Sequence, residues 1–334
     1  MIGTLLFRTD ASTSTGLGHA MRCIALGQEW RRRGGQVVFA MAEWTAGLSD
    51  RLQNERFERL DVETGAEELA TVAMDAHASF VVLDVGPTVV EYSDAFSSTK
   101  VAVIDDAGTD FTSSPDLIVN QNAHAHEALY PGTEPSTLLL GLSFVALRAE
   151  FLRVEPTPKL PPVCQDILLA MGGTDPMNLL APLTRELLAE LDVTVHVVIS
   201  SRHRDATSLG RIAGAQPRLV LHVDETDLAS TMSMADLALT SGGTTVWELA
   251  YMGVPSLVGS VSPLEERLVE GLDRIELFRI LGSLGDTAAH GAVAAVGEAC
   301  QDLEWRQKSS KQAMQLVDGR GTERVVTRIL ELSE

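Results

Sequence analysis

The feature that most constrains the fold is a series of short apolar runs in which Val, Ile, Leu and Phe fill consecutive positions. Strands exposed on one face alternate apolar and polar residues, whereas strands buried on both faces do not. The runs therefore indicate an α/β fold in which parallel sheets lie between layers of helices. In the first half they lie at 2–7, 36–41, 80–84, 101–105 and 116–120, and in the second half at 166–171, 193–200, 218–223, 236–240 and 255–259.

A proline-rich stretch separates the two halves. The segment RVEPTPKLPPV (153–163) has four prolines in eleven residues, which favours an extended linker between domains. We therefore expect two Rossmann-like domains, 1–153 and 164–304. The sheets are expected to face a cleft, with ligands bound by loops at the carboxyl ends of the strands.

The charge and cysteine content exclude several classes of partner. The chain has 26 Lys and Arg against 46 Asp and Glu, a net charge of −20, which weighs against nucleic acid or an anionic membrane surface. Asp or Glu interrupts every apolar run before membrane-spanning length, so no membrane insertion is expected. Cys23, Cys164 and Cys300 are far apart, which indicates a reducing, cytoplasmic location and no disulfide or metal framework.

The first loop of interest, TDASTSTGLGHAMRC (9–23), follows the first apolar run. It lacks the third glycine of a dinucleotide fingerprint, but Gly16 and Gly18 let the backbone pass close to a ligand. His19 is expected in the first turn of a helix, where the dipole would keep its imidazole neutral and able to act as a base. Asp10 is the expected partner that orients it, and Arg22 the expected substrate contact. The alternative is a histidine that only caps or packs the helix.

Two further loops suit an anion such as a phosphate. In MGGTDPMN (171–178), the amides of Gly172 and Gly173 and the hydroxyl of Thr174 precede a helix expected to begin at Pro176 and end at 191. The alternative here is a simple turn with Asp175 as the helix cap.

The other loop, TSGGTTVWELAYMG (240–253), places a second helix N-terminus in the same domain. Glu248 shares a helix face with Thr244 and is expected to accept hydrogen bonds from ribose hydroxyls. The alternative for Glu248 is a solvated helix face. The candidate anion-binding residues of this loop are Ser241, Gly242, Gly243, Thr244 and Thr245.

No metal site is expected. Asp105 and Asp106 are adjacent carboxylates without a third ligand, and they fit the start of a loop better. His124 and His126 are spaced like metal ligands on a strand, but the following residues are helical in pattern and no third ligand joins them.

Taken in order, several motifs between residues 4 and 260 resemble one family. They are FRTDAS, GLGHAMRC, VIDDAG, PDLIVNQNA, LLLGLSFVALRAEF, MGGTDP and SGGTTVWELAYMGVPSL. The chain resembles the pseudaminic-acid hydrolase family of nucleotide-sugar hydrolases, which includes spore-coat polysaccharide proteins. It is more distantly similar to the UDP-N-acetylglucosamine transferase of peptidoglycan synthesis.

The resemblance implies a glycosyltransferase-B fold with no catalytic metal or other cofactor, and UDP held mainly by the C-terminal domain. It implies a UDP-sugar substrate, a 2,4-diacetamido-2,4,6-trideoxy hexose, whose anomeric C–O bond is broken by water. His19 would be the catalytic histidine and Asp10 the first-loop aspartate. A closing helix (305–334) would cross back to the N-terminal domain.

Two segments depart from the family. LDVGP (83–87) replaces a usual Asp-His-Tyr-Gly, and VSPLEERL (261–268) replaces a frequent Asn-Gln; both are expected on the sugar side. The sugar and the acceptor are therefore open. The interpretations are a UDP-sugar hydrolase, a glycosyltransferase with a soluble acceptor, and a non-enzymatic binding protein. We expect a monomer or a weak dimer.

Overall fold

The computed structural model divides the chain into two compact units. The first comprises Met1–Ala149 together with Gly319–Glu334, and the second Glu150–Asp318. The structure describes residues 2–12, 16–63, 65–86, 89–93, 95–96, 99–111, 115–173, 175–285 and 289–333.

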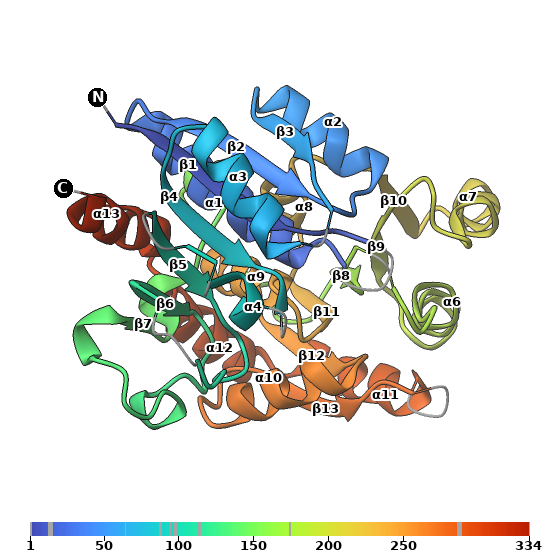
Figure 1. Cartoon of the computed structure of the whole chain (residues 1–334). Coiled ribbons are helices and arrows are strands. Elements are labelled where there is room, and N and C mark those ends of the chain that lie inside the picture. Colours follow the sequence, from blue (N-terminus) through green and yellow to red (C-terminus); the bar gives the residue numbers. More distant parts are fainter. Residues whose placement is uncertain are drawn as a thin grey trace. The chain divides into compact units, whose positions relative to one another are not determined.

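A parallel sheet of seven strands, in the order β3-β2-β1-β4-β5-β6-β7, forms the centre of the first unit (Figure 1). Its strands are β1 (Thr4–Thr9), β2 (Gln36–Met41), β3 (Glu58–Asp61), β4 (Ala78–Asp84), β5 (Lys100–Ile104), β6 (Leu117–Asn120) and β7 (Leu138–Leu140). Its helices are α1 (Gly18–Arg32), α2 (Ala46–Asn54), α3 (Ala66–Asp75), α4 (Val89–Ser93), α13 (Gly321–Ser333) and the short turns η2 (Glu127–Leu129), η3 (Pro135–Thr137) and η4 (Leu142–Phe144).

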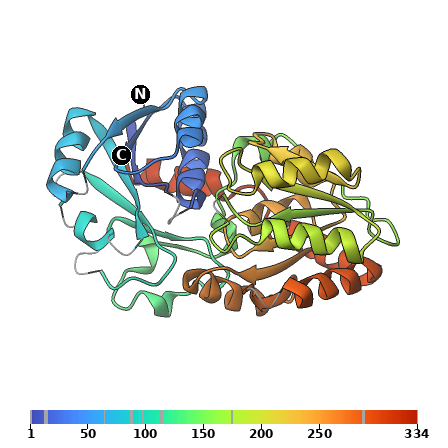
Figure 2. The ribbon, with the colours of Figure 1, turned by 90° about the vertical axis from the view of Figure 1, so that its right-hand side faces the viewer.

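Alternate side chains of β1 enter two different cores, one on each face of this sheet. Leu5 and Phe7 pack with residues of α1, α2 and α13, whereas Leu6 packs with residues of α3 and α4. Figure 2 shows α13 (red) lying beside α1 (blue). Burial on both faces is the reason why these strands read as continuous apolar runs.

The second unit repeats this plan with six parallel strands in the order β10-β9-β8-β11-β12-β13. They are β8 (Asp166–Ala170), β9 (Thr194–Ile199), β10 (Leu219–Val223), β11 (Leu237–Ser241), β12 (Ser256–Ser260) and β13 (Arg279–Ser283). The helices are α5 (Ala149–Leu152), α6 (Leu180–Glu190), α7 (Ala206–Ala215), α8 (Leu228–Ser233), α9 (Thr245–Met252), α10 (Pro263–Asp273), α11 (Ala289–Gln301) and α12 (Leu303–Leu316).

The same alternation places the helices of the second unit on two faces. Ile167 and Leu169 of β8 pack with α6, α7 and α11, while Leu168 packs with α8 and α9. The predicted fold class, α/β with two parallel sheets, is therefore confirmed.

Two predicted helices differ from the observed ones. The helix expected from Pro176 begins at Leu180, four residues later. The carboxylate of Asp175 accepts the amides of Leu179, the N-cap residue, and of Leu180, the first helical residue. The closing segment is two helices instead of one: α12 ends before Val317 and α13 starts at Gly321, with Gly319 at φ +76° between them.

Candidate functional site

His19 lies at the carboxyl edge of the first sheet, as the second residue of α1. The chain reaches it through Gly16, whose φ of +76° favours glycine and whose amide donates to the carbonyl of Ser12. Gly18 is the first residue of α1. Of the two predicted glycines, Gly16 therefore adopts a backbone conformation that favours glycine, and Gly18 begins the helix that carries His19.

The imidazole of His19 is paired with Asp84, the last residue of β4. Nδ1 of His19 lies 2.6 Å from Oδ1 of Asp84, whose side chain is fully buried, whereas 21% of the His19 side chain is exposed. The Asp84 charge raises the pKa of His19 and prevails over burial and Arg22, which lower it. The direction of this shift is opposite to the one expected from the helix dipole, because a carboxylate in direct contact outweighs the dipole.

Arg22, one turn further along α1, is surrounded by carboxylates. Its guanidinium donates to both oxygens of Asp84 at 2.6 Å and to both oxygens of Asp106 at 2.8 Å, and its side chain is only 4% exposed. These two charges keep the pKa of Arg22 high despite burial. Each terminal nitrogen of Arg22 donates to an internal carboxylate, and the expected direct contact with a substrate stays a prediction.

Asp106 and Asn122 complete this cluster, which we call the His19 cluster (His19, Arg22, Asp84, Asp106 and Asn122). Asn122 donates to Asp106 at 2.6 Å, and each of these residues follows a strand, β5 or β6. Parallel strands bring their carboxyl ends to one edge of the sheet, which explains how residues from four segments meet. Asp84 and Asn122 are not predicted as site residues from the sequence, although each lies at or just after the end of an apolar run, which is a usable signal.

Asp10 does not orient His19. Its Oδ1 pairs with Arg8 at 2.7 Å and accepts the amides of Ala42 and Glu43 after β2. The Arg8 charge and these hydrogen bonds lower the pKa of Asp10 against the opposing effect of burial. The expected pairing is therefore corrected: Asp10 ties the β1 loop to the β2 loop, and Asp84 takes the place beside the imidazole.

The two glycine loops of the second unit lie side by side. They follow neighbouring strands β8 and β11, and a Cβ built on Gly172 would lie 3.7 Å from Oγ of Ser241. Gly172 has φ +71° and is exposed, as is Gly173, while Thr174 lies outside the described residues. The structure therefore brings the second and third predicted loops to one edge of the sheet.

The residues of the β11–α9 loop differ in exposure. Gly243, Thr244 and Thr245 are partly exposed, and among the described residues their amides donate to no other group. Gly242 is buried, and a Cβ there would lie 2.5 Å from Cγ2 of Val269 in α10. Gly242 thus allows close packing, and amides available to an anion begin at Gly243.

Glu265 in the first turn of α10 is bound to this loop. Its carboxylate accepts the amides of Gly242 at 3.3 Å and Val261 at 3.0 Å, and the hydroxyl of Ser241 at 3.5 Å. Burial raises the pKa of Glu265 against the lowering effect of these bonds. This contact was not anticipated from the sequence.

Glu248 is 7% exposed, in the first turn of α9, with Val246, Trp247 and Leu249 also buried. The alternative interpretation, in which Glu248 lies on a solvated helix face, is therefore wrong.

Within the described ranges, no group of three metal-ligating side chains comes together. Asp105, one of the candidates considered for a metal, instead accepts the amides of Ala107, Gly108 and Thr109 and so shapes its own loop. Likewise, no helix in the part of the chain that the structure describes is long and apolar enough to span a bilayer.

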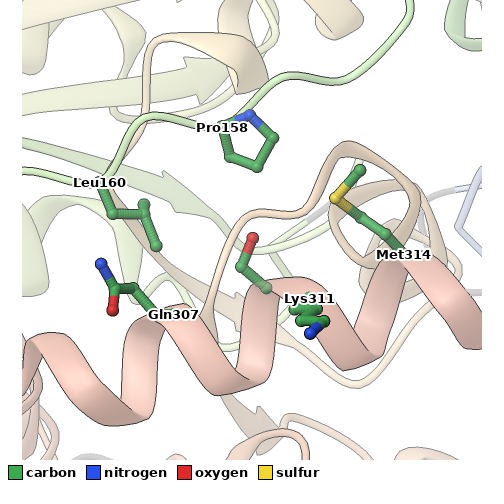
Figure 3. Close-up of a pocket in the computed structure, with 6 residues that line it drawn as sticks. Pro158, Leu160, Gln307, Lys311 and Met314 are labelled. Atoms are coloured by element: carbon green, nitrogen blue, oxygen red, sulfur yellow. The ribbon is translucent and has the colours of Figure 1, made fainter.

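A cavity of about 270 Å³ lies between the 158–160 linker segment and α12, lined by Pro158, Leu160 and Met314 among others (Figure 3). Met314 also approaches Gly253 at the C-terminal end of α9, whereas the glycine loop is at its N-terminal end. The cavity contains none of the predicted site residues.

The His19 cluster and the glycine loops provide two distinct capabilities. A histidine held by a buried carboxylate can take up a proton, and a set of loop amides at a helix N-terminus can bind an anion. Both lie at the carboxyl edges of parallel sheets, where open α/β folds bind their ligands.

The architecture is that of the glycosyltransferase-B enzymes, as the comparison with solved structures confirms. MurG of Acinetobacter baumannii superposes with a TM-score of 0.68 at 14% identity, covering 99% of this chain and 100% of MurG. MnaA of S. aureus, solved with UDP, gives 0.68 at 15% identity, covering 98% and 96%.

Relatives by sequence confirm the resemblance to the pseudaminic-acid hydrolase family. The chain is 23% identical to the UDP-2,4-diacetamido-2,4,6-trideoxy-β-L-altropyranose hydrolase of Campylobacter jejuni, over 73% of this chain and 86% of that protein. It is 26% identical to the spore coat polysaccharide biosynthesis protein SpsG of Bacillus subtilis, over 62% of this chain and 59% of SpsG.

An uncharacterised protein of Methanocaldococcus jannaschii, MJ1062, is 22% identical over 75% of this chain. The match spans only 54% of that protein's length. No protein-family model matches the chain.

Proposed function

We propose that this protein hydrolyses a UDP-linked sugar, with His19 as the general base that activates water. The observation that carries the proposal is the His19–Asp84 pair, in which a buried carboxylate contacts one nitrogen of a partly exposed imidazole. The similarity to the Campylobacter hydrolase over 86% of its length supports the choice of reaction and of a diacetamido-trideoxy hexose as the sugar.

In the proposed reaction, Nδ1–H of His19 donates to Asp84, which leaves Nε2 as the proton acceptor. Nε2 removes a proton from water as the water oxygen bonds to the anomeric carbon. The bond from that carbon to the diphosphate oxygen breaks, and UDP departs with the electron pair. Asp84 stabilises the imidazolium formed, and Arg22 and Asp106 fix the position of Asp84.

The glycine loops of the second unit are proposed to bind the diphosphate. Among the described residues the amides of Gly243, Thr244 and Thr245 at the N-terminus of α9 have no acceptor, which suits the negative charge of a diphosphate, and Gly172 lies beside Ser241 of the same loop. Glu248, buried on α9, is proposed to accept hydrogen bonds from ribose hydroxyls. A diphosphate is a good leaving group, so no second catalytic carboxylate is needed.

The test is release of UDP from the UDP-diacetamido sugar in the absence of any acceptor. We expect release by the unaltered protein and a loss of about 10²–10⁴-fold in His19→Ala, the usual contribution of a general base. His126→Ala is the matched control, because His126 is exposed in the same unit and outside the His19 cluster.

Three outcomes would contradict the proposal. Release only after a sugar or other acceptor is added would identify a glycosyltransferase. Full activity in His19→Ala would show that His19 is not the general base. Loss of UDP binding in His19→Ala, measured by calorimetry, would show that the loop binds nucleotide instead of acting on water.

A further inference from the structure

Glu265 lies where the ends of β11 and β12 and the starts of α9 and α10 meet. Its two carboxylate oxygens accept three donors, one hydroxyl and two amides, from the loops that follow those strands. Ser262 caps α10 by accepting the Glu265 amide, so the backbone at this residue is fixed. The carboxylate is therefore a defined part of the β11–α9 loop.

The Glu265 carboxylate lies next to the backbone of the loop that is proposed to bind an anion. A Cβ built on Gly243 would lie 3.8 Å from Oε1 of Glu265, and Gly243 is the first of the residues whose amides are available to an anion. Oppositely charged groups favour one another at such distances and like charges oppose, especially where burial limits screening. Glu265 thus presents a negative charge to the place where a diphosphate would bind.

We propose that Glu265 is an internal anion that competes with the diphosphate of a nucleotide for the β11–α9 loop. This inference rests on the proposed function. When a nucleotide diphosphate binds there, the Glu265 carboxylate either moves away from Gly242 and Ser241, which breaks its hydrogen bonds, or stays in place and repels the diphosphate. Both cases weaken binding. The consequence is a low affinity for free UDP, which favours release of the product after the sugar has left.

Glu266 provides a matched control. It is the next residue of the same helical turn, carries the same charge and is exposed, and the loop contacts belong to Glu265. Glu265→Gln and Glu266→Gln change net charge equally, so a difference between them reports position and not total charge.

The experiment is calorimetric titration of the full chain and both variants with UDP, pyrophosphate and uridine. We expect Glu265→Gln to bind UDP and pyrophosphate at least about tenfold more tightly, a change of about 1.4 kcal/mol. Uridine, which has no phosphate, should show no gain, and Glu266→Gln should stay within about twofold of the unaltered protein. Glu265→Ala, which removes the carboxylate and its hydrogen bonds, should gain as much, and its melting temperature checks that it folds.

The failures of the two proposals are distinguishable. If the unaltered protein binds UDP and Glu265→Gln binds it no more tightly than Glu266→Gln does, the competition is refuted while the nucleotide site stands. If neither the unaltered protein nor either Glu265 variant binds UDP or pyrophosphate, both proposals fall. An equal gain for uridine would assign the effect to a loosened loop instead of to charge, and would also refute the competition.

Discussion

The pKa of His19 depends mainly on the neighbouring carboxylate of Asp84. Asp84 is the largest influence and raises the pKa of the imidazole above its usual 6.5, while burial and Arg22 lower it. Because the folded-state pKa of His19 exceeds the unfolded value, protonation of this imidazole contributes stability that is fully present below about pH 6.5 and is lost as the pH rises through the folded pKa. As a base, His19 is competent only above that folded pKa.

The Asp84→Asn variant tests this dependence. Removing the carboxylate leaves burial and Arg22 as the main influences, so we expect the pKa of His19 to fall well below its value in the unaltered protein. An NMR titration of the His19 ring proton measures it directly and needs no activity. Asp10→Asn is the control, because Asp10 pairs with Arg8 instead of His19. An equal shift in both variants would contradict the assigned pairing.

The sequence predicts His19 as a candidate base but does not predict the residues that surround it. The glycines before it mark a turn at the end of a strand, which is a local signal, and local signals can be read along the chain. Asp84, Asp106 and Asn122 lie more than sixty residues away and meet His19 only through the strand order of the sheet. The position of Asp10 at the carboxyl end of the first strand predicts it as the partner of His19, but its side chain is bound to the β2 loop instead.

At the scale of elements, α13 is attached to the first unit by more than its apolar face. Thr322 accepts the Leu147 amide and donates to the Leu147 carbonyl, and Gly321 lies directly against the backbone of Val145. Arg33 at the end of α1 donates to Thr327 of α13. The first turn of α13 thus packs directly against the backbone of Val145.

Gly321→Ala should therefore destabilise the protein. A Cβ there would overlap the nitrogen and oxygen of Val145, which are backbone atoms and cannot rotate away, so we expect a loss of about 1–3 kcal/mol in the free energy of unfolding. Gly47→Ala in α2 is the control, because nothing lies within 4 Å of its Cβ and alanine favours a helix by up to about 1 kcal/mol. Urea denaturation measures both. Equal stability of the two variants would contradict this packing.

The burial of a strand largely decides whether the sequence predicts it. The ten apolar runs all correspond to strands, with ends shifted by up to two residues, and nine of these strands lie inside their sheets, where both faces are covered. Among the described strands, those not predicted are β3, β7 and β13, each at an edge of a sheet; the fourth edge strand, β10, was predicted because its sequence, LVLHV, is mostly apolar. The sequences of β3, β7 and β13, ERLD, LLL and RILGS, are short or partly polar, since an edge strand needs less apolar surface.

At the scale of the whole molecule, the second unit is inserted within the first. The first unit runs to Ala149, resumes at Gly319 and includes α13, whose Val325, Val326 and Ile329 are buried in its core. A chain ending at Asp318 would uncover the apolar side of α1 and parts of β4 and β5, while the core of the second unit would stay whole.

We expect this truncated chain to lose hydrogen-exchange protection in the first unit and keep it in the second. The amides of β1 and β4 should exchange at least about tenfold faster than in the unaltered protein, and those of β8 and β11 should be unchanged. Mass spectrometry of peptic peptides reports each strand separately. Uniform loss of protection in both sheets would mean that the two units unfold together.

The insertion also fixes an order of events during synthesis. Chains emerge from the ribosome N-terminal end first, and domains fold as units once their residues are available. Every residue of the second unit emerges before α13 does, so the unit begun first is finished last. All seven strands of the sheet that carries His19 emerge before the second unit, but the helix layer on one face of that sheet lacks α13, and the apolar side of α1 stays uncovered, until residues near Ser333 have left the tunnel.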